Sequence, residues 1–145
     1  MERIVIFDFN RTLFDPEKKG LLTCAKDLLS DLRKKGYGLL LLSHGQADKA
    51  LVDRLGIRGY FEEIILSRAK SKKDFEKAIG NRQIDLKESF VVGDRIKKEV
   101  RIGNELGFKT IWLRRGKFDS ELPKKANEEP NFVIGELAEV TNIIQ

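Results

Sequence analysis

Two short apolar runs in this 145-residue chain each end at residues that could bind a metal ion. Asp8 and Asn10 come directly after Ile4-Val5-Ile6-Phe7, and Asp94 follows Phe90-Val91-Val92-Gly93. A single Asp at the end of a strand is usually a turn former. Carboxylate oxygens, however, are the hard ligands that Mg²⁺ prefers, so two such residues brought together would make an oxygen-only metal pocket.

A third apolar run, Leu39–Leu42, ends in residues suited to binding phosphate. It is followed by Ser43, His44 and Gly45. The Ser43 hydroxyl and the backbone amides around Gly45 could bind a phosphoryl oxygen. We interpret His44 as a loop residue near the site, in preference to a metal ligand or a base.

The elements that must position these residues alternate between strand and helix. Buried strands are expected at 4–7, 38–42, 61–66, 90–92 and 109–113, with a short edge strand at 132–134. Apolar residues recur at helical spacing in the segments 21–32, 46–55, 72–79, 96–106 and 136–143. This alternation predicts an α/β Rossmann-like domain: a mostly parallel sheet of five or six strands with helices on both faces. The carboxyl ends of such strands form the ligand crevice.

Composition limits the remaining possibilities. The length fits one domain, 1–145, and no apolar run approaches the roughly 18 residues that span a bilayer. The chain contains a single cysteine and begins without a signal-peptide pattern, so we expect a cytoplasmic protein. The high charged fraction, 35%, resembles thermophile usage. Lys and Glu are interspersed, so the net charge of +5 indicates a solvated surface in preference to a nucleic-acid interface.

The three motifs together resemble the haloacid dehalogenase (HAD) superfamily. The stretch from Ile4 to Phe14 is similar to its first motif, Asp-x-Asp-x-Thr after a buried strand. Residues 39–45 are similar to the second motif, and residues 90–99 to the fourth. The resemblance implies a phosphatase-like fold in which Asp8 is the phosphate-accepting nucleophile and Mg²⁺ is the cofactor.

The same resemblance implies two further site residues. The family's third motif is a lysine that neutralises phosphate charge; Lys70, Lys72 and Lys73 are candidates, and Lys70 fits the family spacing best. Glu99, about one helical turn beyond Asp94, is either an outer acid or water-mediated metal ligand, or a surface residue of an amphipathic helix. The implied metal set is Asp8, Asn10, Asp94 and Glu99.

The chain departs from the family pattern at Asn10, where phosphatases of the family carry a second Asp that protonates the leaving oxygen. An amide does not titrate near neutral pH, although the backbone carbonyl of Asn10 can still bind Mg²⁺. Three functions therefore stay open: a phosphatase slowed by the missing acid, a non-catalytic phosphate- or metal-binding protein, and a 2-haloacid dehalogenase. We favour the phosphatase, with Asp8, Asn10, Ser43 and Lys70 as its catalytic residues.

The spacing of the motifs leaves no room for a cap domain. Asp8 and Ser43 are 35 positions apart, and Ser43 and Lys70 only 27. We therefore expect an open site that a second subunit could close, with a phosphorylated small molecule or a macromolecular end as substrate. The segment 11–20 would form a flap, with Phe14 as its apolar contact. The role of the polar segment 114–130 is left undetermined.

Overall fold

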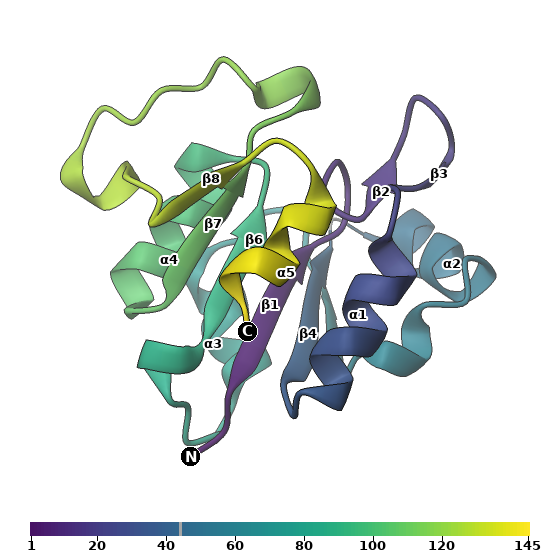
Figure 1. Ribbon diagram of the computed structural model, residues 1–145, viewed down its shortest axis with the longest axis horizontal. Coiled ribbons are helices and arrows are strands. Elements are labelled where there is room, and N and C mark those ends of the chain that lie inside the picture. The colour runs from purple at the N-terminus through teal and green to yellow at the C-terminus, as the bar shows by residue number, and fades with distance from the viewer. Residues whose placement is uncertain (44) are drawn as a thin grey trace.

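Six strands form one parallel sheet in the order β5-β4-β1-β6-β7-β8 (Figure 1). The computed structural model describes residues 1–43 and 45–145. The strands of this sheet are β1 (Ile4–Asp8), β4 (Gly38–Ser43), β5 (Glu63–Leu66), β6 (Phe90–Gly93), β7 (Lys109–Leu113) and β8 (Phe132–Ile134). The sequence-based prediction of an α/β Rossmann-like fold is confirmed.

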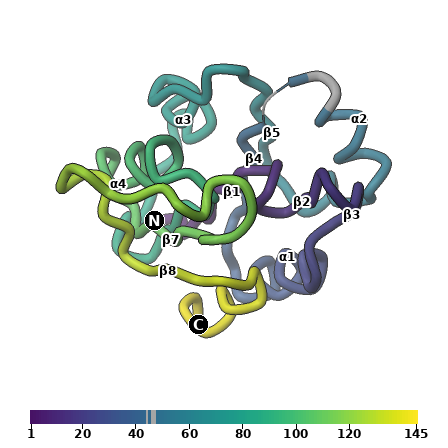
Figure 2. The backbone as a smooth tube through the Cα atoms, turned by 90° about the horizontal axis from the view of Figure 1, so that it is seen from above, coloured from purple at the N-terminus to yellow at the C-terminus, as the bar shows by residue number. Residues whose placement is uncertain are grey.

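Helices cover both faces of the sheet, as Figure 2 shows from above. They are α1 (Ala25–Lys34), α2 (Gln46–Arg54), α3 (Lys72–Ile79), α4 (Arg101–Leu106) and α5 (Val140–Ile143). One face packs against α1 and α5 around a core that contains Phe7, Leu29 and Val140. The other face packs against α3 and α4, with Phe75 and Ile102 in its core. The sheet is therefore buried on both sides, which explains why its strands are apolar throughout.

Strand register brings the three polar strand ends to one edge of the sheet. Asp8 pairs with Leu42, the residue before Ser43, and Phe7 pairs with Val92, two residues before Asp94. Because all three strands run in the same direction, their carboxyl ends lie next to one another. The fold thus places residues from three distant parts of the sequence around one crevice.

The segment between β1 and α1 differs from the sequence-based prediction. It contains a small antiparallel hairpin of β2 (Phe14–Asp15) and β3 (Gly20–Leu21), so α1 begins at Ala25 and not at Leu21. Phe14, expected to contact a substrate, is only 5% exposed and stacks on Phe9 with ring centroids 5.2 Å apart. That expectation was wrong: the ring anchors the flap to the core.

A short π-helical turn, η3 (Ile96–Val100), joins β6 to α4. Gly103 lets α4 lie close to the sheet, since a Cβ there would come within 2.8 Å of Thr110 Cγ2.

Across the described residues, none of the helices is both long and apolar enough to cross a membrane.

Candidate functional site

The polar strand ends surround a hollow of about 210 Å³. Its lining combines acids and bases from β1, the loops after β1 and β6, η3, the loop before α3 and the segment after β7. The lining residues are Asp8, Asn10, Arg11, Lys70, Asp94, Arg95, Lys98, Glu99, Lys117 and Phe118. Every residue of the metal set implied by the sequence is among them.

Three carboxylates lie together at the floor of this hollow. Asp8, Asp94 and Glu99 each offer an oxygen within 4.8 Å of the others. The three side chains are almost inaccessible, with exposed fractions of 3%, 3% and 2%. Like charges this close and this buried repel one another unless a cation or protons compensate them.

The raised pKa values of two of these acids show that burial disfavours their charged forms. Burial raises the pKa of Asp94 to about 7; the Glu99 carboxylate adds to the rise and Lys70 opposes it. Burial also raises the pKa of Glu99, which Lys70 and a backbone hydrogen bond partly offset. Without a divalent cation, burial therefore favours the protonated form of both acids.

Asp8 is held at both of its oxygens. Lys70 Nζ donates to Oδ1, and Thr12 Oγ1 donates to Oδ2 over 3.2 Å. Burial lowers the pKa of Lys70, while the nearby Glu99 and Asp94 carboxylates act in the opposite direction. Lys70 has a φ of +46°, a conformation that costs energy for a residue with a side chain and that is common at functional sites.

Glu99 reaches the floor because of the π-helical turn and the glycine before Asp94. Turns of this kind inside helices are often found at functional sites. A Cβ on Gly93 would lie 2.6 Å from Cβ of Glu99, so only glycine leaves room for this side chain. Trp112 Nε1 donates to the backbone carbonyl of Asp94 over 3.0 Å and fixes that strand end. Glu99 is therefore not a surface residue of an amphipathic helix.

The floor has the features of a divalent-cation site. Its donors are carboxylate oxygens only, the set that Mg²⁺ prefers. Oδ2 of Asp94 and both carboxylate oxygens of Glu99 are buried and have no hydrogen-bond partner among the described residues. Buried oxygens without partners are costly, and a cation would satisfy them. The residues present thus fit the ion that the sequence implied.

Of the residues expected to bind phosphate, Lys70 lines the hollow, whereas Ser43 and Gly45 are not among its lining residues. Ser43 is fully buried at the end of β4, and its hydroxyl donates to Asp48 Oδ2 over 2.5 Å. The carbonyl of Gly45 accepts the first backbone hydrogen bonds of α2, from Asp48 and Lys49. His44 lies outside the described residues, so the interpretation of this residue stays a prediction.

The structure separates the three candidate lysines. Lys70 is 5% exposed and faces the acids, whereas Lys72 and Lys73 are exposed on the first turn of α3. A capping box of Ser71 and Asp74 fixes the start of that helix directly after Lys70. Of the three, only Lys70 is placed to compensate the charge of Asp8.

Several site residues were not expected from the sequence. Thr12 stands within the quoted motif, but its bond to Asp8 was not anticipated. Arg95 follows Asp94 directly before η3, Lys98 lies on η3 before Glu99, and Lys117 and Phe118 come from the segment 114–130. Adjacency to Asp94 and to Glu99 is the sequence signal that could have identified Arg95 and Lys98; no motif marks Lys117 or Phe118.

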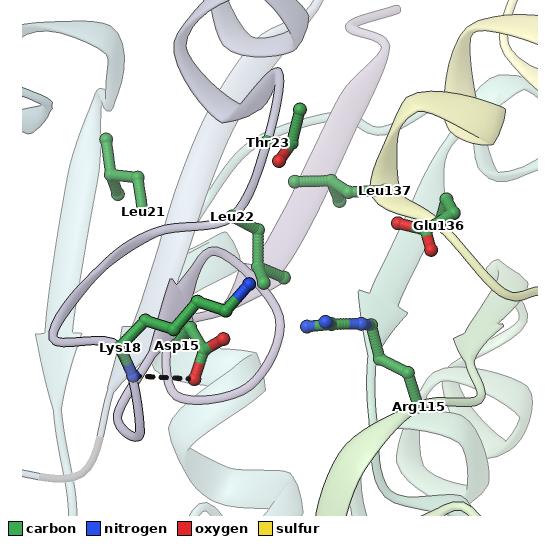
Figure 3. Close-up of a pocket in the computed structure, with 8 residues that line it drawn as sticks. All are labelled: Asp15, Lys18, Leu21, Leu22, Thr23, Arg115, Glu136 and Leu137. Atoms are coloured by element: carbon green, nitrogen blue, oxygen red, sulfur yellow. Dashed lines mark hydrogen bonds between the residues drawn. The ribbon is translucent and has the colours of Figure 1, made fainter.

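A second hollow lies beside the flap and is lined by the residues in Figure 3. Asp15 accepts a backbone hydrogen bond from Lys18 across the β2–β3 turn, and the Arg115 side chain points toward the Asp15 carboxylate (Figure 3). At about 50 Å³ it has room for a few water molecules or a small ion, but not for a substrate. We regard it as the place where the flap packs against the end of the chain.

Comparison with known proteins agrees with this geometry. A HAD-hydrolase-like family model matches residues 67–140. A glyceraldehyde 3-phosphate phosphatase of Methanopyrus kandleri is 30% identical over 124 residues, which cover 81% of this chain and 53% of that protein. The chain thus spans about half the length of the curated relatives it matches.

Two solved structures share the fold. A HAD phosphatase of Thermococcus onnurineus superposes with a TM-score of 0.79 at 14% identity, covering 99% of this chain and 98% of that one. A HAD-hydrolase of Bacillus subtilis bound to magnesium gives a TM-score of 0.71 at 20% identity, covering 86% and 56%. Because the family model matches half of the chain, the chain belongs to the HAD-like hydrolases.

Proposed function

We propose that the chain is a Mg²⁺-dependent phosphoester hydrolase in which Asp8 accepts the phosphoryl group. The observation that carries the proposal is the buried cluster of Asp8, Asp94 and Glu99 with Lys70 bound to Asp8. A structural role alone does not require three carboxylates in a solvent-connected hollow, since burying unpaired charge is destabilising. The names of the curated relatives support a phosphatase, and the magnesium bound to the Bacillus subtilis protein supports the metal.

Asp8, the Asn10 carbonyl and Asp94 would hold the ion, with Glu99 as a further acid at the floor. When bound, Mg²⁺ neutralises charge on the phosphoryl oxygens and offsets the repulsion among the carboxylates. Lys70 supplies a second positive charge at Asp8. Ser43 and the turn at Gly45 are the candidates for binding the remaining phosphate oxygens, in which case the Ser43 hydroxyl would leave Asp48.

The reaction follows from the position of Asp8. A carboxylate oxygen of Asp8 attacks phosphorus, the bond from phosphorus to the ester oxygen breaks, and the alcohol leaves after taking a proton from water. Water then attacks the phosphorus of the aspartyl-phosphate, which releases inorganic phosphate and regenerates the carboxylate. Thr12 and Lys70 orient that carboxylate throughout, and this positioning supplies much of the catalysis in phosphoryl transfer.

Asn10 determines which esters react well. It lines the hollow but carries no titratable proton, so leaving groups that need little protonation should be favoured. Loss of one general acid typically costs about 10²–10⁴-fold in rate. The proposed enzyme is therefore slow on alkyl phosphates and faster on activated aryl phosphates.

The expected substrate is a phosphorylated small molecule that enters an open site. Only the β2–β3 hairpin and α1 separate Asp8 from β4, and only α2, η1 (Arg58–Tyr60) and β5 separate Ser43 from the loop carrying Lys70. None of these elements has the size of a cap domain. The proposal that a second copy of the chain closes the site, as well as the expectations of a cytoplasmic, heat-stable protein, remain predictions.

A non-catalytic binding protein is the second candidate, and Asn10 is the observation that favours it. The same cluster could bind metal and phosphate without turnover. A dehalogenase is disfavoured, because such an enzyme needs no metal and the acids here are arranged for one.

The test is Mg²⁺-dependent release of phosphate from p-nitrophenyl phosphate by wild type and by Asp8→Ala. We expect turnover by wild type with Mg²⁺, none with EDTA, and none with Asp8→Ala. Asp31→Ala, which removes an exposed carboxylate on α1, should behave as wild type. Equal release by wild type and Asp8→Ala would contradict the proposal. Tight Mg²⁺ binding without any release would support the non-catalytic alternative.

A further inference from the structure

Three cationic side chains gather around a single aromatic ring at the rim of the hollow. Arg95 lies 3.8 Å from the ring centroid of Phe118, Lys117 Nζ 5.4 Å and Arg11 6.0 Å. All four residues line the hollow that contains Asp8. They come from three separate parts of the chain: the flap, the start of η3 and the segment after β7.

The three cations differ in how well they are paired. Glu121 accepts from Arg95 Nε over 3.1 Å and from the backbone N–H of Ile96 over 2.9 Å, so Arg95 is fully engaged. These bonds also fix the segment 114–121 against the site. Arg95 therefore acts as a support that holds Phe118 in place.

Arg11 and Lys117 are poorly paired by comparison. Arg11 reaches Glu17 over 3.4 Å, but Glu17 is 69% exposed, so this ion pair is weak. Arg11 Nε has no hydrogen-bond partner among the described residues. Among the residues that the structure describes, Lys117 has no carboxylate partner within 4.0 Å. One shared aromatic ring attracts both cations but supplies no negative charge to pair with either of them.

We propose that Arg11 and Lys117 bind a second anionic group of the substrate, one that is not hydrolysed. The proposal rests on the proposed function, because it places the reacting phosphate at Asp8 and the second anion at the rim of the same hollow. The substrate would then be a small phosphate ester that also carries a carboxylate or a second phosphate. Glyceraldehyde 3-phosphate, which the names of the curated relatives mention, carries no such group.

The size and surroundings of the hollow favour a small molecule over a polymer. Its volume of about 210 Å³ lies below the ~300–1,000 Å³ typical of sites for drug-sized ligands. Glu17 and Glu121 stand next to the cations, so the positive surface does not continue outward as a track for a nucleic-acid strand. A three-carbon ester with charges at both ends is small enough for this volume.

The experiment compares two esters with the same carbon skeleton, 3-phosphoglycerate and glycerol 3-phosphate. They differ in a carboxylate against a hydroxymethyl group. We expect wild type to show a kcat/KM at least tenfold higher for 3-phosphoglycerate. Lys117→Gln and Arg11→Gln should each reduce that ratio by roughly threefold to tenfold, mainly through KM, since each removes one charge contact. Lys125→Gln, an exposed lysine of the same segment, serves as the matched control and should leave the ratio unchanged.

Failure of this proposal can be distinguished from failure of the proposed function. Turnover of both esters at equal kcat/KM, or equal effects of Lys117→Gln and Lys125→Gln, would overturn the second-anion site and leave the phosphatase intact. If neither ester is hydrolysed, calorimetric titration of wild type with each ester in Mg²⁺ decides the matter. Tighter binding of 3-phosphoglycerate that weakens in Lys117→Gln would then support the anion site, and equal affinities would overturn it.

Discussion

Gly93 and Glu99 are packed so closely that a Cβ on Gly93 would lie 2.6 Å from Cβ of Glu99 and 2.7 Å from Oε1. The glycine ends β6, and the π-helical turn η3 brings Glu99 back over it. This contact holds the third carboxylate of the cluster beside Asp94. The position of Glu99 in the carboxylate cluster therefore depends on a residue that has no side chain of its own.

The first prediction concerns this contact. Gly93→Ala should push Glu99 away from Asp94, lower Mg²⁺ affinity at least tenfold and destabilise the protein by about 1–3 kcal/mol, the usual cost of overpacking. Calorimetric titration with Mg²⁺ and thermal unfolding provide the two readouts. Gly59→Ala is the control, because a Cβ there would meet no atom within 4 Å. Unchanged Mg²⁺ affinity in Gly93→Ala would show that Glu99 does not contribute to the site.

A second prediction concerns pH and follows from the raised pKa of Asp94. In the metal-free folded state this pKa is about 7, against 3.8 as the ordinary value. The folded state thus holds a proton that the unfolded chain releases, and stability falls as pH rises from about 4 to about 7, then levels off. Below about pH 4 Asp94 is protonated in both the folded and the unfolded state, so it no longer destabilises the folded state.

The measurement is the melting temperature in EDTA and in Mg²⁺ across this range. In EDTA it should fall with rising pH, and Asp94→Asn should flatten the curve. Added Mg²⁺ should stabilise the protein most above pH 7, since bound metal requires the ionised acids. A Mg²⁺ effect that is equal at pH 5 and pH 8 would argue against these ligands.

The third prediction distinguishes Lys70 from its neighbours. Lys70→Met should reduce kcat/KM for p-nitrophenyl phosphate by about 10²–10³-fold, because a preorganised charge at the nucleophile is lost. Lys72→Met and Lys73→Met, on exposed positions of α3, should stay within twofold of wild type. Steady-state kinetics at saturating Mg²⁺ measure all three. A comparable loss of kcat/KM in Lys72→Met or Lys73→Met would contradict the assignment of Lys70 as the lysine that compensates the charge of Asp8.

The fourth prediction restores the missing acid. Asn10→Asp should raise turnover most for alkyl phosphates, whose leaving oxygen needs a proton, and least for p-nitrophenyl phosphate. The slope of log kcat/KM against the pKa of the leaving alcohol should therefore become shallower. An unchanged slope would indicate that position 10 does not face the reacting oxygen.

The fold could be predicted from the sequence because its strands are buried on both faces. Runs such as Leu39–Leu42 have no polar residue and can form only an interior strand or helix segment, and their short length favours a strand. The two-residue strands β2 and β3 carry no comparable pattern. Because these two strands pair, α1 begins at Ala25 and not at the predicted Leu21. Local helix propensity does not indicate that pairing.

The floor of the site was predictable for a related reason. The carboxyl ends of parallel strands lie at one edge of the sheet, so the proximity of Asp8 and Asp94 could be predicted from the sequence. The rim was not predictable, because Lys117 and Phe118 lie in a polar segment without periodicity. Phe14 was expected to be the apolar contact of the flap with a substrate or partner, whereas it stacks on Phe9 in the core.

The most direct test of the central claim is anomalous diffraction from a crystal soaked in Mn²⁺, which replaces Mg²⁺ at oxygen sites. We expect one strong anomalous peak between the carboxylates of Asp8 and Asp94, at about 2.1–2.2 Å from an oxygen of each. The peak should disappear in Asp94→Asn. A fully occupied Mn²⁺ elsewhere, or an unbroken Lys70–Asp8 ion pair with no peak beside it, would contradict the proposed metal site and the hydrolase that depends on it.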